Sequence, residues 1–207
     1  MRTYIYVDGF NLYYRSLKQT PFKWLDLSGL FRDVLMPHHD ILKIKYFTAR
    51  VSARPDDLSE PQRQDTYLRA LQHHCPEVEV YYGHFLTHKV RAPLADTGNR
   101  TRLVNVIRTE EKGSDVNLAV HLLNDAWLDD YDCAIVVTND SDIAEGMRLV
   151  KQHKRKWIGL ITPGTSHTSR ELMAHADFSR RIQKRALRKN QLPSPIPGTS
   201  ITKPANW

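Results

Sequence analysis

The sequence contains few cysteines and no long apolar run. Only Cys75 and Cys133 occur in 207 residues, and they do not form a CxxC pair, which favours free, buried thiols in a reducing compartment. The apolar runs, such as Ala134 to Val137, are too short to span a bilayer. No hydrophobic leader precedes the strand-like run that begins after Met1. We therefore expect a cytoplasmic protein that does not enter a membrane.

Several catalytic signatures are also missing. No GxSxG, GxGxxG or Walker-type GxxxxGK pattern occurs, so nothing supports a serine hydrolase, a dinucleotide-binding enzyme or a P-loop enzyme. The composition is that of an ordinary globular protein, with 41% hydrophobic and 26% charged residues. Domain-size statistics favour a single compact domain for a chain of this length.

The positive charge is concentrated at the carboxyl end. The formal net charge is +7, yet residues 1–177 contain 23 basic and 23 acidic residues. No acidic residue follows Phe178, whereas seven basic ones do: Arg180, Arg181, Lys184, Arg185, Arg188, Lys189 and Lys203. Such a segment either binds the phosphates of a nucleic acid or is simply solvated, and we favour nucleic acid.

Short β-branched and aromatic runs alternate with helix-like stretches. The expected strands are Tyr4–Val7, Ile41–Thr48, Val78–Tyr82, Ala134–Thr138 and Trp157–Thr162. The expected helices are Asn11–Lys18, Leu27–Leu35, Glu60–His74, Asp115–Leu128, Ser141–His153 and Ser169–Ala176. This alternation predicts an α/β domain with a mainly parallel sheet.

Three segments are expected to lack regular structure, and the first of them is the loop of residues 52–61. Residues 90–99 are predicted to form a loop. Residues 187–207 contain four prolines after position 190 and show no periodicity, so they are predicted to be a flexible, basic, Pro-rich tail. The folded domain is accordingly expected to span residues 1–186.

Acidic residues directly follow two of the expected strands. Asp8 and Asp140 each end such a run, Asp142 lies two residues beyond Asp140, and Asp115 opens a helix. Ligands of open α/β sheets bind beyond the carboxyl ends of the strands, and carboxylates that converge there repel one another unless a cation compensates. A donor set of oxygens favours Mg²⁺ or Mn²⁺ over Zn²⁺. Such a metal activates water for phosphodiester cleavage.

Each acid also has a local structural explanation. Asp8 and Gly9 suit a turn, with Asn11 capping the next helix. Asp140 suits a helix cap, and Asp115 at a helix start is favoured by the macrodipole. These local explanations account less well for acids that follow two separate buried strands.

Four blocks of the sequence resemble one known family. The blocks are Tyr4-Ile5-Tyr6-Val7-Asp8-Gly9-Phe10-Asn11-Leu12, Glu111-Lys112-Gly113-Ser114-Asp115-Val116, Val136-Val137-Thr138-Asn139-Asp140-Ser141-Asp142-Ile143, and Ser169 with Leu172, Ala176, Asp177 and Phe178. In this order they closely resemble the LabA-like NYN domains of the PIN-like nuclease superfamily. Asn139 and Ile143 depart from the pattern, because related sequences often carry glycine and an aromatic residue there.

The resemblance implies a Rossmann-like (PIN-like) three-layer α/β fold with a mainly parallel sheet, and a metal-dependent endoribonuclease that uses Mg²⁺ or Mn²⁺. Carried over by position, Asp8, Asp115 and Asp140 are the expected metal ligands. Asp142 is expected to be an outer ligand or a carboxylate that orients water. Asn11 is expected to hold the first carboxylate or to contact a phosphate.

Further residues are expected to contact the substrate. Lys112 lies three residues before Asp115, and Thr138 occupies the hydroxyl position of the third block. Residues 178–190 are compatible with a helix. Four of their cations recur at intervals of three and four residues, which would place them on one face of that helix: Arg181, Lys184, Arg185 and Arg188. The expected partner is a nucleic acid, RNA in the first place, and the sequence leaves a homo-oligomer open.

Three other classes remain alternatives. A Toprim-like, DNA-acting nuclease would use Asp140 and Asp142 as its DxD pair, but it requires a glutamate where this chain has Asp8. A non-catalytic NYN module that binds RNA or a protein would keep the fold and the basic end. A haloacid-dehalogenase-type phosphatase would require a second aspartate two residues after Asp8, which is absent.

Overall fold

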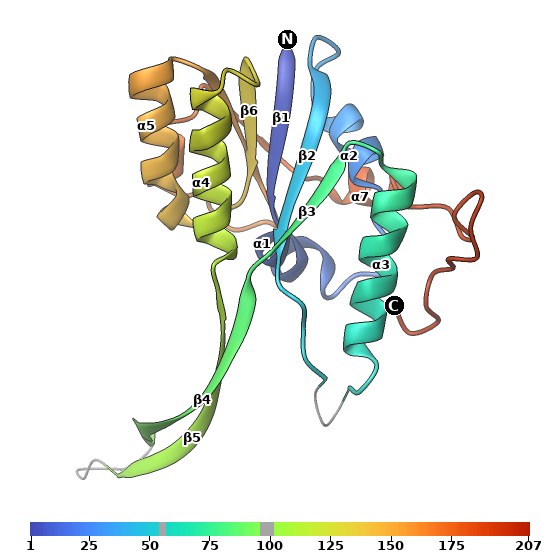
Figure 1. The fold of residues 1–207 in the computed structure, drawn as a ribbon, viewed down its shortest axis with the longest axis vertical. Coiled ribbons are helices and arrows are strands. Elements are labelled where there is room, and N and C mark those ends of the chain that lie inside the picture. The colour runs from blue at the N-terminus through green and yellow to red at the C-terminus, as the bar shows by residue number, and fades with distance from the viewer. Residues whose placement is uncertain (54–56, 96–101) are drawn as a thin grey trace.

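One parallel sheet organises the molecule (Figure 1). The structure, a computed structural model, describes residues 1–53, 57–95 and 102–207. Six strands form the sheet in the order β3-β2-β1-β6-β7-β8: β1 (Arg2–Asp8), β2 (Asp40–Thr48), β3 (Val78–Tyr82), β6 (Cys133–Val137), β7 (Trp157–Thr162) and β8 (Phe178–Arg181). Every neighbouring pair is parallel, so all six carboxyl ends lie at one edge.

Helices cover both faces of this sheet and complete three layers (Figure 1). One face carries α4 (Ser114–Trp127) and α5 (Ala144–Lys154). The other carries α2 (Leu27–Val34), α3 (Glu60–His74) and α7 (Lys184–Lys189). The short helices α1 (Gly9–Leu12) and α6 (Arg170–Met173) follow β1 and β7. The predicted three-layer α/β fold with a mainly parallel sheet is confirmed. No helix among the described residues is long and apolar enough to cross a membrane.

The central strand is apolar because both of its faces are covered. Side chains alternate across β1, so Ile5 and Val7 join the core beneath α2 and α3, while Tyr4 and Tyr6 join the core beneath α4 and α5. All six residues from Thr3 to Asp8 are buried. The strand therefore holds its last residue, Asp8, on a rigid support at the carboxyl edge of the sheet.

A buried ion pair lies within the second of these cores. The Lys45 ammonium donates a hydrogen bond to the Asp125 carboxylate at 2.6 Å, and the Tyr6 hydroxyl donates to the same oxygen at 2.7 Å. The Lys45 and Asp125 side chains are only 6% and 4% exposed. Two donors thus compensate the buried carboxylate, and burial raises the pKa of the Tyr6 hydroxyl far above its usual range.

All five expected strands are present. The prediction that a helix could span residues 178–190 is wrong for the first half of that segment. Residues 178–181 form the edge strand β8, which pairs with β7, and only Lys184–Lys189 are helical. The pairing depends on Gly159, because a β-carbon there would lie 2.3 Å from the Phe178 ring. The contact is made across strands and is invisible in the local sequence.

The expected flexible tail is also wrong, because residues 187–207 pack against the domain. Leu192, Ile196 and Ile201 are buried in the core beneath α2 and α3. The Leu192 backbone N–H donates to the Trp24 carbonyl at 2.9 Å, and the Trp207 ring lies 6.1 Å from that of Trp24. Apolar residues spaced between the prolines provide this packing, although no helical or strand period marks them.

A long antiparallel hairpin replaces part of the loop expected at residues 90–99. It consists of β4 (His84–Pro93) and β5 (Leu103–Lys112), which pair along their full length as a separate two-stranded sheet. Positions 96–99 of the expected loop lie outside the described residues. Figure 1 shows this hairpin projecting away from the three layers, beyond the carboxyl edge of the parallel sheet. We refer to residues 84–93 and 103–112 as the arm.

Candidate active site

The strand order reverses at the centre of the sheet, between β1 and β6. From β1 the chain proceeds outward through β2 and β3, then returns to the other side of β1 at β6 and continues through β7 to β8. A crevice forms beyond the carboxyl ends of strands at such a switch point. Asp8 ends β1, and Asp140 follows β6 by three residues. The two acids that the strand pattern singled out therefore flank the crevice.

One buried hydroxyl connects these two acids. The Thr138 hydroxyl donates to Asp8 Oδ2 at 2.8 Å and accepts the backbone N–H of Asp140 at 3.1 Å. Thr138 is fully buried, so the prediction that it contacts substrate is wrong. Its position directly after β6 allows it to reach β1, and its role is to hold the two acidic segments in register.

Asn11 holds the first carboxylate through its backbone. Its N–H donates to Asp8 Oδ1 at 2.9 Å, while its side-chain oxygen accepts the backbone N–H of Asn139 at 3.1 Å. Asn139 in turn accepts the N–H of Ser169 at 2.8 Å and donates to the His167 carbonyl at 2.9 Å. The asparagine at position 139, where related sequences often have glycine, thus ties the third block to the fourth.

The acids surround one open pocket. Its lining residues are Asp8, Phe10, Asn11, Tyr14, Arg15, Phe85, Glu111, Ser114, Asp115 and Asp140. Three of the four predicted acids are among them, whereas Asp142 is exposed and does not line the pocket. The Asp142 N–H donates to Asp140 Oδ1 at 3.1 Å, so this residue supports Asp140 from outside.

Glu111 is a further carboxylate of the pocket that the sequence interpretation did not assign. It accepts the backbone N–H of Ser114 at 3.0 Å and the Ser114 hydroxyl at 2.8 Å, at the amino end of α4. A β-carbon at Gly83 would lie 2.5 Å from the Lys112 carbonyl oxygen, so glycine is required beside this turn. Glu111 is the penultimate residue of β5, close to a strand end as Asp8 is, but the strand itself was not among those expected.

Arg15 is the second residue that the sequence interpretation missed. It lies in a π-helical turn, Tyr13–Leu17, a distortion often found at functional sites. Its guanidinium donates to the Ser166 hydroxyl at 2.8 Å. Among the described residues that line the acidic pocket, Arg15 is the only cation. It is therefore placed to balance negative charge on a bound group.

Burial and mutual repulsion raise the pKa values of two pocket carboxylates. Burial raises the pKa of Asp8, and Asp140 and Glu111 add to the rise. Burial likewise raises the pKa of Asp115 to about 6, with further contributions from Asp8 and Asp140. A pocket that resists ionisation in this way is one in which a bound cation restores the carboxylates to their charged form.

The donor set fits a hard divalent metal, with one restriction. In the described residues, no three His, Cys, Asp or Glu side chains lie close enough together to hold a single ion. The predicted trio of Asp8, Asp115 and Asp140 lines the pocket without forming such a ligand set. Mg²⁺ commonly retains several waters and takes one or two carboxylates, so Asp8 and Asp140, held together by Thr138, fit that mode.

The predicted substrate cations are not gathered at this pocket. Lys112 forms an ion pair with Glu110 at 3.0 Å and does not line the acidic pocket. Arg181 and Arg185 line a separate groove beside α2 and α7, and Lys184 does not line that groove. The Arg188 guanidinium instead lies 5.9 Å from the centre of a phenylalanine ring. The prediction of a single cationic face is wrong: Arg181 lies in β8 and the other three cations lie in α7, and of those three only Arg185 lines the same groove as Arg181.

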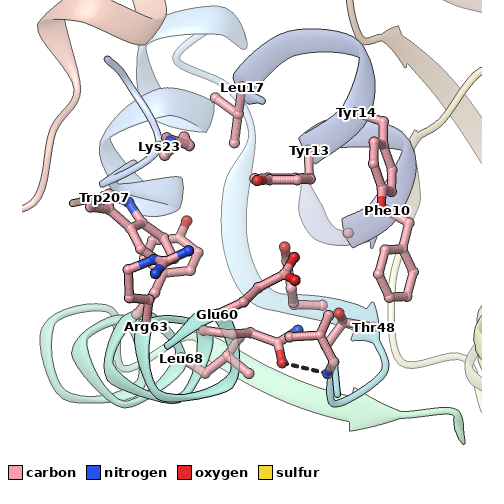
Figure 2. Close-up of a pocket in the computed structure, with 15 residues that line it drawn as sticks. Phe10, Tyr13, Tyr14, Leu17, Lys23, Thr48, Glu60, Arg63, Leu68 and Trp207 are labelled. Carbon is pink, nitrogen blue, oxygen red and sulfur yellow. Dashed lines mark hydrogen bonds between the residues drawn. The ribbon is translucent and has the colours of Figure 1, made fainter. Parts of the chain in front are cut away.

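A second pocket adjoins the acidic one (Figure 2). Aromatic rings dominate its wall: Phe10, Tyr13, Tyr14, Tyr46, Tyr67 and Trp207. Figure 2 shows Tyr13 pointing into the pocket, with Phe10 and Tyr14 on one side and Trp207, Arg63 and Lys23 on the other. The Trp207 indole nitrogen is buried and has no hydrogen-bond partner within the described structure. Phe10 and Tyr14 line both pockets.

The raised pKa of Asp115 leads to a stability prediction for the metal-free protein. The pKa of Asp115 in the folded protein, about 6, exceeds its ordinary value of 3.8, so folding favours the protonated carboxyl group. The stability that this group contributes is therefore fully present below about pH 4 and is lost as the pH rises through about 6. In EDTA, wild type should therefore lose stability relative to Asp115→Asn between about pH 4.5 and about pH 7.

Urea unfolding at several pH values measures this difference. Asp132→Asn is the matched control, because its hydrogen bond to Arg2 lowers the pKa of Asp132, so this carboxylate is already ionised throughout the range. A difference between wild type and Asp115→Asn that does not change with pH would contradict the prediction.

A doubly wound parallel sheet with carboxylates at its switch point defines the class as a Rossmann-like α/β protein with an acidic crevice. The model of the NYN domain family matches residues 2–182 of the chain. The protein therefore belongs to the NYN domain family, which is part of the PIN-like nuclease superfamily.

Two individual proteins are also similar to this chain. The 6-hydroxy-3-succinoylpyridine 3-monooxygenase HspA of Pseudomonas putida (strain DSM 28022 / S16) is 35% identical over 238 residues, which cover 100% of this chain and 75% of the relative. The crystal structure of a protein of unknown function from Vibrio parahaemolyticus RIMD 2210633 superimposes with a TM-score of 0.54 at 20% identity, and the match covers 88% of this chain and 93% of the other. The second likeness supports the fold alone.

Proposed function

We propose that the protein is a metal-dependent endoribonuclease whose active site is the acidic pocket. The observation that carries the proposal is the set of four carboxylates, Asp8, Glu111, Asp115 and Asp140, around one pocket at the switch point of an NYN domain. Their mutual repulsion supports a role in binding a cation. Mg²⁺ or Mn²⁺, when bound there, would supply an activated water and neutralise charge at the reacting phosphate.

The side chains of the pocket then have separate tasks. Asp8 and Asp140 would hold the metal, and Thr138 fixes the position of their two segments. Asp115, which a bound cation would return to its charged form, would accept the proton of the attacking water. Arg15 binds the phosphate group of the substrate, which orients the phosphodiester toward the carboxylates.

Incubation of the purified chain with labelled RNA and DNA pools tests the proposal. We expect RNA to be cut internally in the presence of Mn²⁺ or Mg²⁺, because either ion can occupy an oxygen-lined site. EDTA should stop the reaction. Cleavage that continues in EDTA would contradict a metal-dependent reaction, and tight Mn²⁺ binding without cleavage of any nucleic acid would instead support a non-catalytic NYN module.

A second candidate function rests on the Pseudomonas relative and the aromatic pocket together. That relative is named as a 3-monooxygenase of 6-hydroxy-3-succinoylpyridine, a pyridine ring with an acidic side chain. An aromatic wall that also carries Lys23 has the chemistry to hold a planar ring and a carboxylate, whereas Arg63 on the same wall is already paired with Asp57. In this alternative, the aromatic pocket rather than the acidic one would bind the substrate.

Calorimetric titration with 6-hydroxy-3-succinoylpyridine distinguishes the two functions. Binding that Lys23→Met weakens, in a preparation that cleaves neither RNA nor DNA, would favour the second candidate. Absence of binding, together with cleavage that depends on Mn²⁺, would favour the nuclease.

A further inference from the structure

The arm begins at the acidic pocket. Phe85 in β4 and Glu111 in β5 are directly paired, and both line that pocket. The Phe85 ring also makes an edge contact with Phe10, with 5.8 Å between the ring centroids. One face of the arm is therefore continuous with the wall of the acidic pocket.

The register determines which side chains continue that face outward. Residues directly opposite each other in an antiparallel pair lie on one face, and the face repeats every second residue. Outward from Phe85, this face carries four further pairs: Thr87 with Thr109, Lys89 with Ile107, Arg91 with Asn105, and Pro93 with Leu103. The two threonine hydroxyls lie 3.0 Å apart, as expected for neighbours on one face.

Charge is divided between the two faces of the arm. Beyond Glu111, the pocket-side face of the described strands carries Lys89 and Arg91 and no carboxylate. Both cations are exposed, and neither forms an ion pair with another described residue. The arm's other carboxylate, Glu110, lies on the opposite face, where both Arg108 and Lys112 pair with it, so the cations of that face are engaged within the arm. The pocket-side face is thus positive where it leaves the acidic pocket.

This face also has the mixed character of a nucleic-acid surface. Ile107 is 78% exposed on it, beside the two cations. A two-stranded ribbon exposed on both faces has little stability of its own, and a partner that covers one face would stabilise it. Alternating cations and an apolar side chain suit a single strand, whose phosphates contact the cations while a base lies on the apolar group.

We propose that the pocket-side face of the arm binds the single-stranded nucleic acid that extends from the scissile phosphate, with Lys89 and Arg91 contacting its phosphates. This proposal rests on the proposed nuclease function, because it assigns the acidic pocket to the phosphodiester. It places substrate binding on the arm and not on the carboxyl-terminal cations. It also predicts that the arm matters only for substrates long enough to leave the pocket.

Binding of labelled single-stranded RNA in EDTA tests the arm without requiring cleavage. We compare Lys89→Ala/Arg91→Ala with Arg108→Ala, a charge removal on the opposite face of the same ribbon. For an oligonucleotide of about 16 nucleotides, the double variant should bind about 10-fold more weakly, and its salt dependence should flatten by about 0.7 in log–log slope for each lost cation. Arg108→Ala should stay within about twofold of wild type, and Arg91→Ala alone should show half of the change in slope.

The outcomes separate this proposal from the proposed function. A face-specific loss of binding in a protein that cuts nothing would support the arm and overturn the nuclease. Unchanged binding by the double variant, an equal loss in Arg108→Ala, or an equal loss for an oligonucleotide of about 4 nucleotides would overturn the arm, even if cleavage requires Mn²⁺. Failure of wild type to bind single-stranded RNA or DNA would overturn it in favour of a protein partner.

Discussion

Asp140→Asn is expected to reduce Mn²⁺-dependent RNA cleavage by at least about 100-fold while leaving the fold intact. The substitution removes the charge that a metal ligand needs. It keeps the shape of the side chain and the oxygen that accepts the Asp142 N–H at 3.1 Å, so the local turn survives. Initial cleavage rates at saturating Mn²⁺ measure the loss, and thermal unfolding checks the fold.

Asp132→Asn is the matched control for this loss. Asp132 precedes β6 and so lies at the opposite edge of the sheet from Asp140, where it binds Arg2. Removal of its charge should leave the rate within about twofold of wild type, because exposed ion pairs contribute little and this one is far from the pocket. Cleavage by Asp140→Asn at the rate of the control would overturn the assignment of the acidic pocket.

Lys45→Met is expected to destabilise the protein by about 3–5 kcal/mol, because it leaves the buried Asp125 carboxylate without its cation. Lys43 offers a close control, two residues earlier in the same strand, with an ion pair to Glu79 in which both side chains are more than a third exposed. Lys43→Met should cost no more than about 1 kcal/mol. Urea unfolding of the two variants measures the difference.

A third variant tests the cause of the destabilisation. Lys45→Met/Asp125→Leu removes both charges, and it should recover most of the loss if the unpaired carboxylate is responsible. The Tyr6 hydroxyl loses its acceptor in this variant, so recovery should be incomplete. Equal stabilities for Lys45→Met and Lys43→Met would contradict the prediction.

The parts of the fold that the sequence predicts are those with a strong local signal. β1 and β6 contain the runs Tyr4–Val7 and Ile135–Val137 of β-branched and aromatic residues, as expected of strands buried on both faces. Asp8 and Asp140 could be identified because each follows such a strand, and parallel strands place their carboxyl ends together. Asp115 was indicated by its place at a helix start and depended more heavily on the NYN resemblance, and it does line the same pocket.

The remaining features depend on contacts between distant segments. β8 requires the Gly159 backbone beneath Phe178, and residues 187–207 are ordered by packing on Trp24. Glu111 could be placed only once β4 and β5 were paired, because the pairing puts it opposite Phe85 at the pocket. Thr138 does lie beside the acids, but the predicted contact with substrate is wrong. The neighbouring strand buries its side chain, and the local sequence does not show this.

The two pockets share part of one wall. Phe10 and Tyr14 line both, and their rings lie 6.3 Å apart in a stacked arrangement. A ligand that rotates either ring in the aromatic pocket would change the shape of the acidic pocket, and the converse holds with the same coupling free energy. A small aromatic molecule would then act on the acidic pocket as an effector without touching a single carboxylate.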